Sequence, residues 1–206
     1  MKKIVLLGDS IRQIGYGNPV AERLSDEFTV WQPKDNCRFA EYTMRMLWDY
    51  KADIAGADII HWNNGLWDVA TLYGDGEFTP IDMYIEQMVR LAKLLKERAK
   101  TVIFATTTPV SEDNKTSTNA TIEKYNRALV PKLEALGVRI NDLYTPLRAG
   151  LDRYLRADKI HLSEEGVALA TELVERAIRE AAETLPEICE EKRQEYENSS
   201  DVGAPI

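Results

Sequence analysis

The sequence of 206 residues is poor in the residues that build disulfide frameworks, metal sites and membrane spans. Its two cysteines, Cys37 and Cys189, are far apart and belong to no Cys-x-x-Cys or Cys/His cluster, so neither a disulfide framework nor a zinc site is indicated. No stretch approaches the roughly 20 apolar residues that are needed to cross a bilayer. The formal net charge of -8 disfavours nucleic acid and anionic membranes as partners, because both require clustered positive charge.

The first residues resemble a signal peptide only superficially. The apolar run Ile4–Leu7 is too short, and Gly8-Asp9-Ser10 interrupts it where such a peptide would continue. Apolar residues make up 44% and charged residues 29% of the chain, as in an ordinary soluble domain with a core. We therefore expect one cytoplasmic domain over residues 1–206, whose tail 186–206 is helical and frayed. A homodimer is an open alternative for its assembly.

Short apolar runs alternate with amphipathic helical stretches along the chain. Five runs are apolar on both faces, which is typical of strands in a covered parallel sheet: residues 4–7, 28–31, 58–62, 101–105 and 138–140. Helices are expected between and after them, at 18–27, 40–50, from 79 onward, 119–136 and 163–184. Thr79 is expected to cap the third of these helices, with Pro80 as its first residue, and Gly137 is expected to end the fourth. The pattern predicts a three-layer α/β/α domain with about five parallel strands and helices on both faces.

Binding sites in such sheets form beyond the carboxyl ends of the strands. Ser10 follows the first strand directly, on a tight turn that Gly8 permits, where its hydroxyl and its backbone N–H face the cleft. A serine hydroxyl is a weak nucleophile that needs an adjacent base. The simpler alternative is an ordinary strand-to-loop turn, which Gly-Asp-Ser also forms.

Only two histidines, His61 and His161, can serve as that base. Asp158 precedes His161 by three residues in a loop before a helix, so one loop can deliver a carboxylate to Nδ1 and leave Nε2 for the serine proton. The alternative is a surface loop in which these two residues occur by chance. His61 lies within an apolar strand, where a core histidine is the better interpretation.

Three further segments fall at the same predicted rim. Residues 62–68 include Asn63 and Asn64, whose amides can donate to an oxyanion or simply form an Asn-Asn-Gly turn. Residues 36–40 open a helix, and backbone N–H groups there favour anions. Residues 106–110 end the fourth strand and are expected to line the pocket. We expect the substrate to contact Asp9, Asn64, Trp62, Trp67, Thr107, Pro109 and Ile160, with Trp62, Trp67 and Tyr73 as an apolar or sugar-stacking wall unless they pack in the core.

Together, Gly8-Asp9-Ser10, the central Asn block and Asp158-x-x-His161 resemble the SGNH, or GDSL-type, hydrolase superfamily over about residues 2–182. The resemblance implies a flavodoxin-like sheet and an esterase, acetylesterase, thioesterase or lipase activity. It implies Ser10, His161 and Asp158 as the catalytic triad, and the Ser10 and Cys37 N–H groups with the Asn63 side chain as the oxyanion hole.

Two blocks depart from the usual pattern of that superfamily. The central block is usually Gly-x-Asn-Asp, so its Asn corresponds to Asn63 or Asn64; we favour Asn63 because a related subgroup has Asn-x-Gly-Leu-(Trp/His)-Asp. The second block is often Asn-Gly-Arg-Thr, and here Cys37 stands at the Gly position. A backbone donor needs no particular side chain, although Cys37 must then tolerate the backbone angles.

The resulting hypothesis is a serine hydrolase that cleaves short-chain acyl esters, such as acetate on a carbohydrate, without a metal or cofactor. Lysophospholipase or thioesterase activity is one alternative, and Cys37 as the nucleophile is a weaker one. A non-catalytic α/β module that binds a small ligand is another. A phosphate or flavin binder is disfavoured because the first loop lacks a Gly-rich or Ser/Thr-rich cradle.

Overall fold

A computed structural model describes residues 1–185, and the predicted helical tail 186–206 lies outside the described residues. Five parallel strands form one sheet in the order β2-β1-β3-β4-β5, as in flavodoxin-like folds. The predicted strands are therefore confirmed, with ends that differ by at most two residues. Their bounds are β1 Lys2–Gly8, β2 Phe28–Trp31, β3 Ala57–Asn63, β4 Ala99–Ala105 and β5 Arg139–Asn141.

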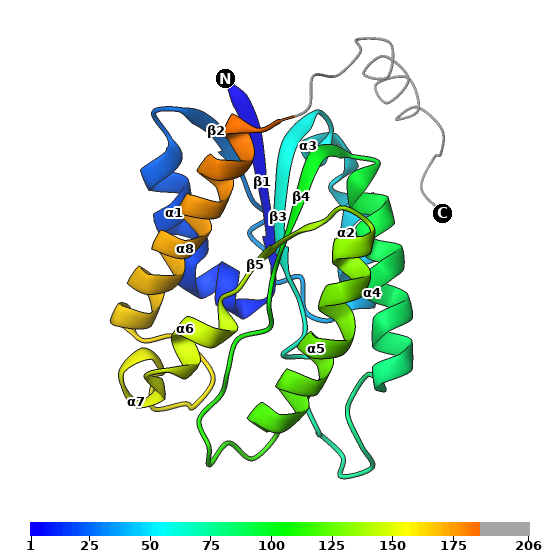
Figure 1. Cartoon of the computed structure of the whole chain (residues 1–206), viewed down its shortest axis with the longest axis vertical. Coiled ribbons are helices and arrows are strands. Elements are labelled where there is room, and N and C mark those ends of the chain that lie inside the picture. The colour runs from blue at the N-terminus through cyan, green and yellow to red at the C-terminus, as the bar shows by residue number, and fades with distance from the viewer. Residues whose placement is uncertain (186–206) are drawn as a thin grey trace.

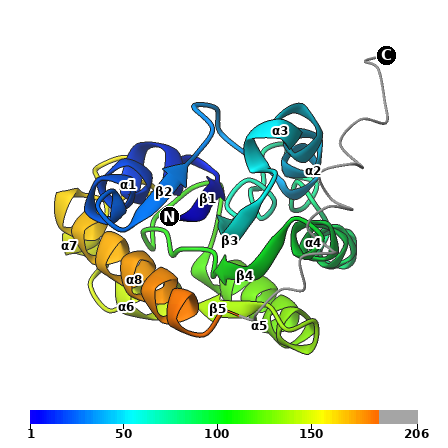
Figure 2. The same ribbon diagram turned by 90° about the horizontal axis from the view of Figure 1, so that it is seen from above.

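Helices cover both faces of this sheet and give the predicted three layers (Figures 1 and 2). The helices α1 and α8 pack together on one face, whereas α2, α4 and α5 pack in sequence on the other. The helices are η1 Arg12–Tyr16 (a π-helix), α1 Gly17–Leu24, α2 Ala40–Asp49, α3 Lys51–Ile54, α4 Ile81–Lys96, α5 Asn119–Ala135, α6 Tyr144–Arg148, α7 Leu151–Tyr154 and α8 Glu164–Glu183. None of the helices in residues 1–185 is long and apolar enough to span a membrane.

The two central strands carry the core. Residues 4–7 of β1 are fully buried, and so are Ile59 and Ile60 of β3, because helices cover both sides of the sheet. The register pairs Gly8 with Asn63, so the last residues of β1 and β3 lie side by side. The strand order reverses between these two strands, and the chain therefore has its topological switch point beside Ser10.

The helix ends agree with the sequence to within two residues, except that the first helix ends at Leu24 and not at residue 27. Ser163 caps α8 by accepting the Gly166 N–H, and Gly137 follows α5 with a positive φ of 75°. The expectation that Thr79 caps the helix at 79 is wrong by one residue: Pro80 is the cap, with ψ of 144°, and the helix begins at Ile81. Thr79 instead donates its hydroxyl to Asp68 at 2.9 Å, which ties the loop after β3 to the helix start.

Four short helical segments have no signal of their own in the apolar pattern, namely η1, α3, α6 and α7. The most important is η1, because it brings Arg12 and Tyr16 into the core immediately after Ser10. Arg12 is buried and donates to backbone carbonyls, including Pro33 at 2.8 Å and Asp35 at 2.6 Å. The chain after β1 is thereby fixed against the loop that follows β2.

Candidate active site

Three side chains from distant parts of the sequence meet at the carboxyl edge of the sheet. His161 Nε2 lies 2.9 Å from Ser10 Oγ, and His161 Nδ1 lies 2.9 Å from Asp158 Oδ2. Both distances are those of good hydrogen bonds. The imidazole thus bridges a hydroxyl and a carboxylate, which is the arrangement in which histidine can take up a serine proton.

The loop that carries Asp158 and His161 is shaped by Asp158 itself. One carboxylate oxygen accepts the backbone N–H groups of Ile160 and His161, at 3.1 and 2.9 Å, and the other faces the imidazole. Partial burial raises the pKa of Asp158, but the hydrogen bonds from the His161 backbone and ring and from Ile160 outweigh it, so the pKa lies below its ordinary value. The carboxylate therefore stays ionised and fixes the histidine tautomer with the proton on Nδ1.

Neighbouring segments brace this loop through Lys159. Lys159 has a left-handed φ of 70°, and its carbonyl accepts the Ser111 N–H at 3.0 Å and the Asn114 side-chain amide at 3.3 Å. The Lys159 ammonium also pairs with Asp113. The sequence does not predict these contacts from the segment after β4, because they depend on which loops lie side by side in the folded chain.

Ser10 lies on a helical turn that begins directly after β1. Its backbone N–H donates to no acceptor among residues 1–185, so it is free for a ligand. The role of Gly8 differs from the expected one: a Cβ at this position would come within 2.0 Å of Asn63 Oδ1, whereas its φ is not positive. Gly8 is required for the close approach of Asn63 rather than for a turn angle.

Asn63 is held at both ends of its side-chain amide. Its Nδ2 donates to Asp9 Oδ1 at 2.7 Å, and its Oδ1 accepts the Tyr16 hydroxyl at 2.7 Å. An ionised carboxylate only accepts, so the amide nitrogen must face Asp9. Nδ2 carries two protons, and within residues 1–185 only one of them has an acceptor. Asn63 therefore has one N–H left to donate beside Ser10.

The expectation that Cys37 supplies a backbone donor is wrong. The Cys37 N–H donates to Gly8 O at 3.0 Å, and its thiol accepts the Gly8 N–H at 3.1 Å. Both groups thus join the loop after β2 to the end of β1. The side chain is fully buried, and burial raises the pKa of the thiol to about 11, which also argues against Cys37 as the nucleophile.

The left-handed turn in this loop falls on the next residue, Arg38, with a φ of 49°. The Arg38 N–H donates to the Asn36 side chain at 2.7 Å, whereas that of Phe39 has no acceptor among residues 1–185. Phe39 precedes α2, where unpaired N–H groups point out of the helix. Phe39 replaces Cys37 as the candidate donor of this loop.

Asn64 and Thr107, which were expected to contact substrate, are buried and hydrogen-bonded within the fold. Asn64 donates to Arg38 O at 2.8 Å and accepts the Thr43 hydroxyl at 3.0 Å. The Thr107 hydroxyl donates to Asn64 O at 2.9 Å. Asn126 of α5 binds both the N–H and the C=O of Thr107 and so fixes the backbone after β4. These residues stabilise the rim of the site through hydrogen bonds. The expectation that Asn64 and Thr107 contact the substrate is therefore wrong.

Trp62, Asp9 and Pro109 are buried as well. The Trp62 ring is fully buried and packs on Phe104 with centroids 4.8 Å apart, so it belongs to the core and not to a substrate wall. Asp9 is 1% exposed and acts on Asn63. Of the expected contact residues, Trp67 is 40% exposed and Ile160 is half-buried, and these two remain available to a ligand.

His61 is a core residue, as expected. It is fully buried in β3, and burial lowers its pKa to about 3, so the ring is neutral. Its Nε2 lies 3.2 Å from the Asn141 side-chain amide, and its ring meets the Tyr16 ring edge to face at 5.6 Å. His61 therefore packs behind Asn63 and does not reach Ser10.

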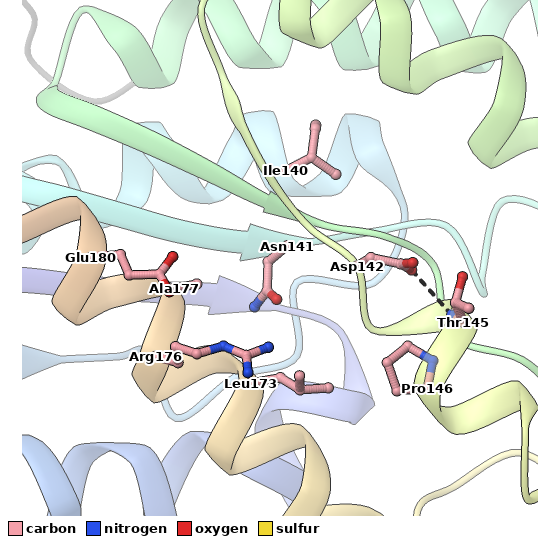
Figure 3. A pocket seen from close by; sticks show the side chains of 9 residues that line it. All are labelled: Ile140, Asn141, Asp142, Thr145, Pro146, Leu173, Arg176, Ala177 and Glu180. Atoms are coloured by element: carbon pink, nitrogen blue, oxygen red, sulfur yellow. Dashed lines mark hydrogen bonds between the residues drawn. The ribbon is translucent and has the colours of Figure 1, made fainter.

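A hollow of about 320 Å³ lies between β5, α6 and α8 (Figure 3), apart from the Ser10 site. Its lining includes Asp142, Arg176 and Glu180, and Asp142 accepts the Thr145 N–H at 3.1 Å. Neither Ser10 nor His161 lines it. In the part of the chain that the structure describes, no group of three or more His, Cys, Asp or Glu side chains is arranged to hold a metal ion.

No protein-family model and no curated protein sequence matches the chain. Solved structures do match it in fold. A lipase/acylhydrolase from Enterococcus faecalis superposes with a TM-score of 0.71 at 22% identity, over 86% of this chain and 95% of that one. The acetyl xylan esterase AlAXEase superposes with a TM-score of 0.71 at 20% identity, over 85% and 99%. The acetylxylan esterase Axe2 from Geobacillus stearothermophilus superposes with a TM-score of 0.69 at 17% identity, over 86% of this chain and 94% of that one.

This chain has the SGNH-hydrolase fold. In this fold Ser10 follows β1 and the Asp158–His161 loop precedes α8, and the two segments meet at the carboxyl edge of the sheet. The five parallel strands and the helices on both faces agree with it throughout.

Proposed function

We propose that the protein is a serine ester hydrolase in which Ser10 is the nucleophile, His161 the general base and Asp158 its orienting carboxylate. One observation carries the proposal: a single imidazole lies 2.9 Å from both the Ser10 hydroxyl and the Asp158 carboxylate. A surface loop with an incidental Asp and His would not present both ring nitrogens to these two partners.

The chemistry follows from this geometry. His161 Nε2 removes the Ser10 proton as Oγ attacks the ester carbonyl, and Asp158 stabilises the imidazolium that forms. The negative charge that develops on the carbonyl oxygen is bound by the free N–H of Ser10 and the second N–H of Asn63, with Phe39 N–H as a third donor. His161 then protonates the leaving alcohol, and water releases the acyl group by the reverse sequence.

The proposed substrates are short-chain acyl esters, including acetyl groups on carbohydrates. Two of the proteins with similar folds are named as acetylxylan esterases. Catalytic mutants of Axe2 replace a serine, an aspartate and a histidine, and that aspartate also precedes the histidine by three residues. The similarity to the lipase/acylhydrolase from Enterococcus faecalis supports acyl hydrolysis more broadly, so lysophospholipid and thioester substrates are the second candidates.

The test is hydrolysis of p-nitrophenyl acetate by the wild type, the Ser10→Ala variant and the Cys37→Ala variant. We expect turnover by the wild type and Cys37→Ala and none above background by Ser10→Ala. A panel of acyl chain lengths, acetylated xylo-oligosaccharides and thioesters then ranks the substrate classes by kcat/KM. A wild type that hydrolyses none of these esters, in a folded preparation, contradicts the proposal and favours a non-catalytic binding module.

A further inference from the structure

We propose that Tyr16 is a positioning residue that fixes the side-chain amide of Asn63 for stabilisation of the oxyanion. The inference deepens the proposed ester hydrolase function and rests on it. Asn63 must present one N–H toward the carbonyl oxygen at Ser10 while it lies at the end of a buried strand. A side-chain amide turns readily about its last torsion, which has a broad, two-fold energy profile. Something in the fold must therefore hold it.

Two side chains hold the Asn63 amide, one at each end, and we call them together the Asn63 clamp: Asp9 and Tyr16. Asp9 accepts one proton of Nδ2 at 2.7 Å, and the Tyr16 hydroxyl donates to Oδ1 at 2.7 Å. With both bonds in place, the plane of the amide is fixed and the second Nδ2 proton has one direction. The space for this arrangement exists because Gly8 has no Cβ, which would come within 2.0 Å of Oδ1.

Tyr16 is itself held rigidly enough to act through Asn63. Its side chain is fully buried, and its ring packs perpendicular to the His61 ring, with centroids 5.6 Å apart and an interplanar angle of 88°. The hydroxyl thus has one place in the fold, and burial raises the pKa of Tyr16 well above its usual value, so it remains a donor. Asp9, Ser10 and Tyr16 lie on one short segment, so the nucleophile and both members of the clamp move together.

A tyrosine that only fills the core would affect stability and leave the reaction unchanged. The two roles separate in a double-mutant cycle, because a residue that acts through Asn63 has nothing to act on once Asn63 is truncated. Tyr16→Phe removes only the hydroxyl and leaves the ring against His61. Tyr125→Phe is the matched control: Tyr125 is also buried, and its hydroxyl donates to Thr79 O at 2.9 Å, away from Ser10.

In the experiment, kcat and KM for p-nitrophenyl acetate are measured for the wild type, Tyr16→Phe, Asn63→Ala, the double variant and Tyr125→Phe, with folding checked by circular dichroism. We expect Tyr16→Phe to lower kcat about tenfold and to change KM less than about twofold, since loss of one oxyanion donor outright costs about 100-fold or more. We expect no further loss when Tyr16→Phe is added to Asn63→Ala. We expect Tyr125→Phe to lower stability and to leave kcat within about twofold of the wild type.

A folded Tyr16→Phe variant with wild-type kcat overturns the inference, and so does a tenfold loss that persists in the Asn63→Ala background. A wild type without activity refutes the proposed function itself and is recognised before any variant is compared.

A measurement on the wild type alone tests the proposal if Tyr16→Phe does not fold. The clamp predicts one Asn63 side-chain amide proton that is shifted and protected from hydrogen exchange in nuclear magnetic resonance spectra. Two freely exchanging protons contradict it.

Discussion

Replacing Asp9 by Asn is expected to stabilise the protein at neutral pH and to slow ester hydrolysis. Asp9 is 1% exposed, and burial raises its pKa to about 6, although the Ile11 N–H, the Asn63 amide and the nearby Arg12 oppose the shift. The fold therefore keeps a carboxylate ionised at pH 7 in a place that disfavours its charge. A destabilising buried charge is expected at an active site where that charge contributes to catalysis, here as the acceptor of the Asn63 amide.

The magnitude follows from the shift in pKa. A rise from 3.8 to about 6 corresponds to about 3 kcal/mol of destabilisation above pH 6, taken as an upper bound. Because the folded state binds this proton more tightly than the unfolded chain, the free energy of unfolding falls as the pH rises from about 4 to about 6. Asn is neutral at every pH, and its Oδ1 can still accept the Ile11 and Asn63 N–H groups, which both bind Oδ1 of Asp9.

We therefore expect Asp9→Asn to raise the free energy of unfolding at pH 8 by about 1–3 kcal/mol, with a gain that disappears toward pH 4. We expect kcat to fall about tenfold, because a hydrogen bond to a charged acceptor is roughly twice as strong as one to a neutral acceptor. The bond that holds Asn63 is thereby weakened.

Urea unfolding at pH 4.5 and pH 8, together with kcat for p-nitrophenyl acetate at pH 8, measures both effects. Asp152→Asn is the control, because this exposed aspartate of α7 lies far from Asn63 in sequence and makes no contact with the clamp. An Asp9→Asn variant that is less stable than the wild type at pH 8 refutes the reasoning. So does a change in stability that is equal at the two pH values.

Variants at four further positions test the roles of His161, His61, Cys37 and Gly8. His161→Ala should lower kcat by about 1000-fold or more, whereas His61→Ala should mainly lower the midpoint of urea unfolding; equal activity losses in two equally folded variants contradict the assignment. Cys37→Ser should keep kcat within about tenfold of the wild type, because the thiol is buried and protonated, and a loss as large as that of Ser10→Ala would restore Cys37 as the nucleophile. Gly8→Ala should lower the free energy of unfolding by about 1–3 kcal/mol and also lower kcat, because its Cβ displaces Asn63 Oδ1; an unchanged thermal midpoint and rate would show that this close approach is unimportant.

The sheet and the three residues at its edge follow from the sequence because their signals are local. Apolar runs mark β1 and β3, and a serine directly after β1 must lie at the carboxyl edge. Asp158 and His161 share one loop, so their spacing alone brings a carboxylate to an imidazole.

The rest depends on contacts between segments that are distant in sequence. The Cys37 N–H was predicted to face the cleft, but it donates to Gly8 O, and only the pairing of two loops decides this. Asn63 and Asn64 are neighbours with the same side chain, and the fold gives them opposite roles because one points to Asp9 and the other to Arg38 O.

The π-helix after Ser10 is a second feature that periodicity could not reveal. Its residues Arg12–Tyr16 are too few to show a helical repeat, and Gly15 within it is non-helical. Burial of Arg12 among backbone carbonyls is also contrary to the usual surface position of arginine. Tyr16 belongs to the same short segment, so no helical repeat in the sequence marks it as a core residue.

The central claim is that Ser10 is a nucleophile activated by His161. The most direct measurement is labelling with a fluorophosphonate probe, followed by mass spectrometry of the modified peptide. We expect a single modification on Ser10 in the wild type, and none in Ser10→Ala or in heat-unfolded protein. A folded wild type that remains unlabelled, or that is labelled at a serine other than Ser10, would contradict it.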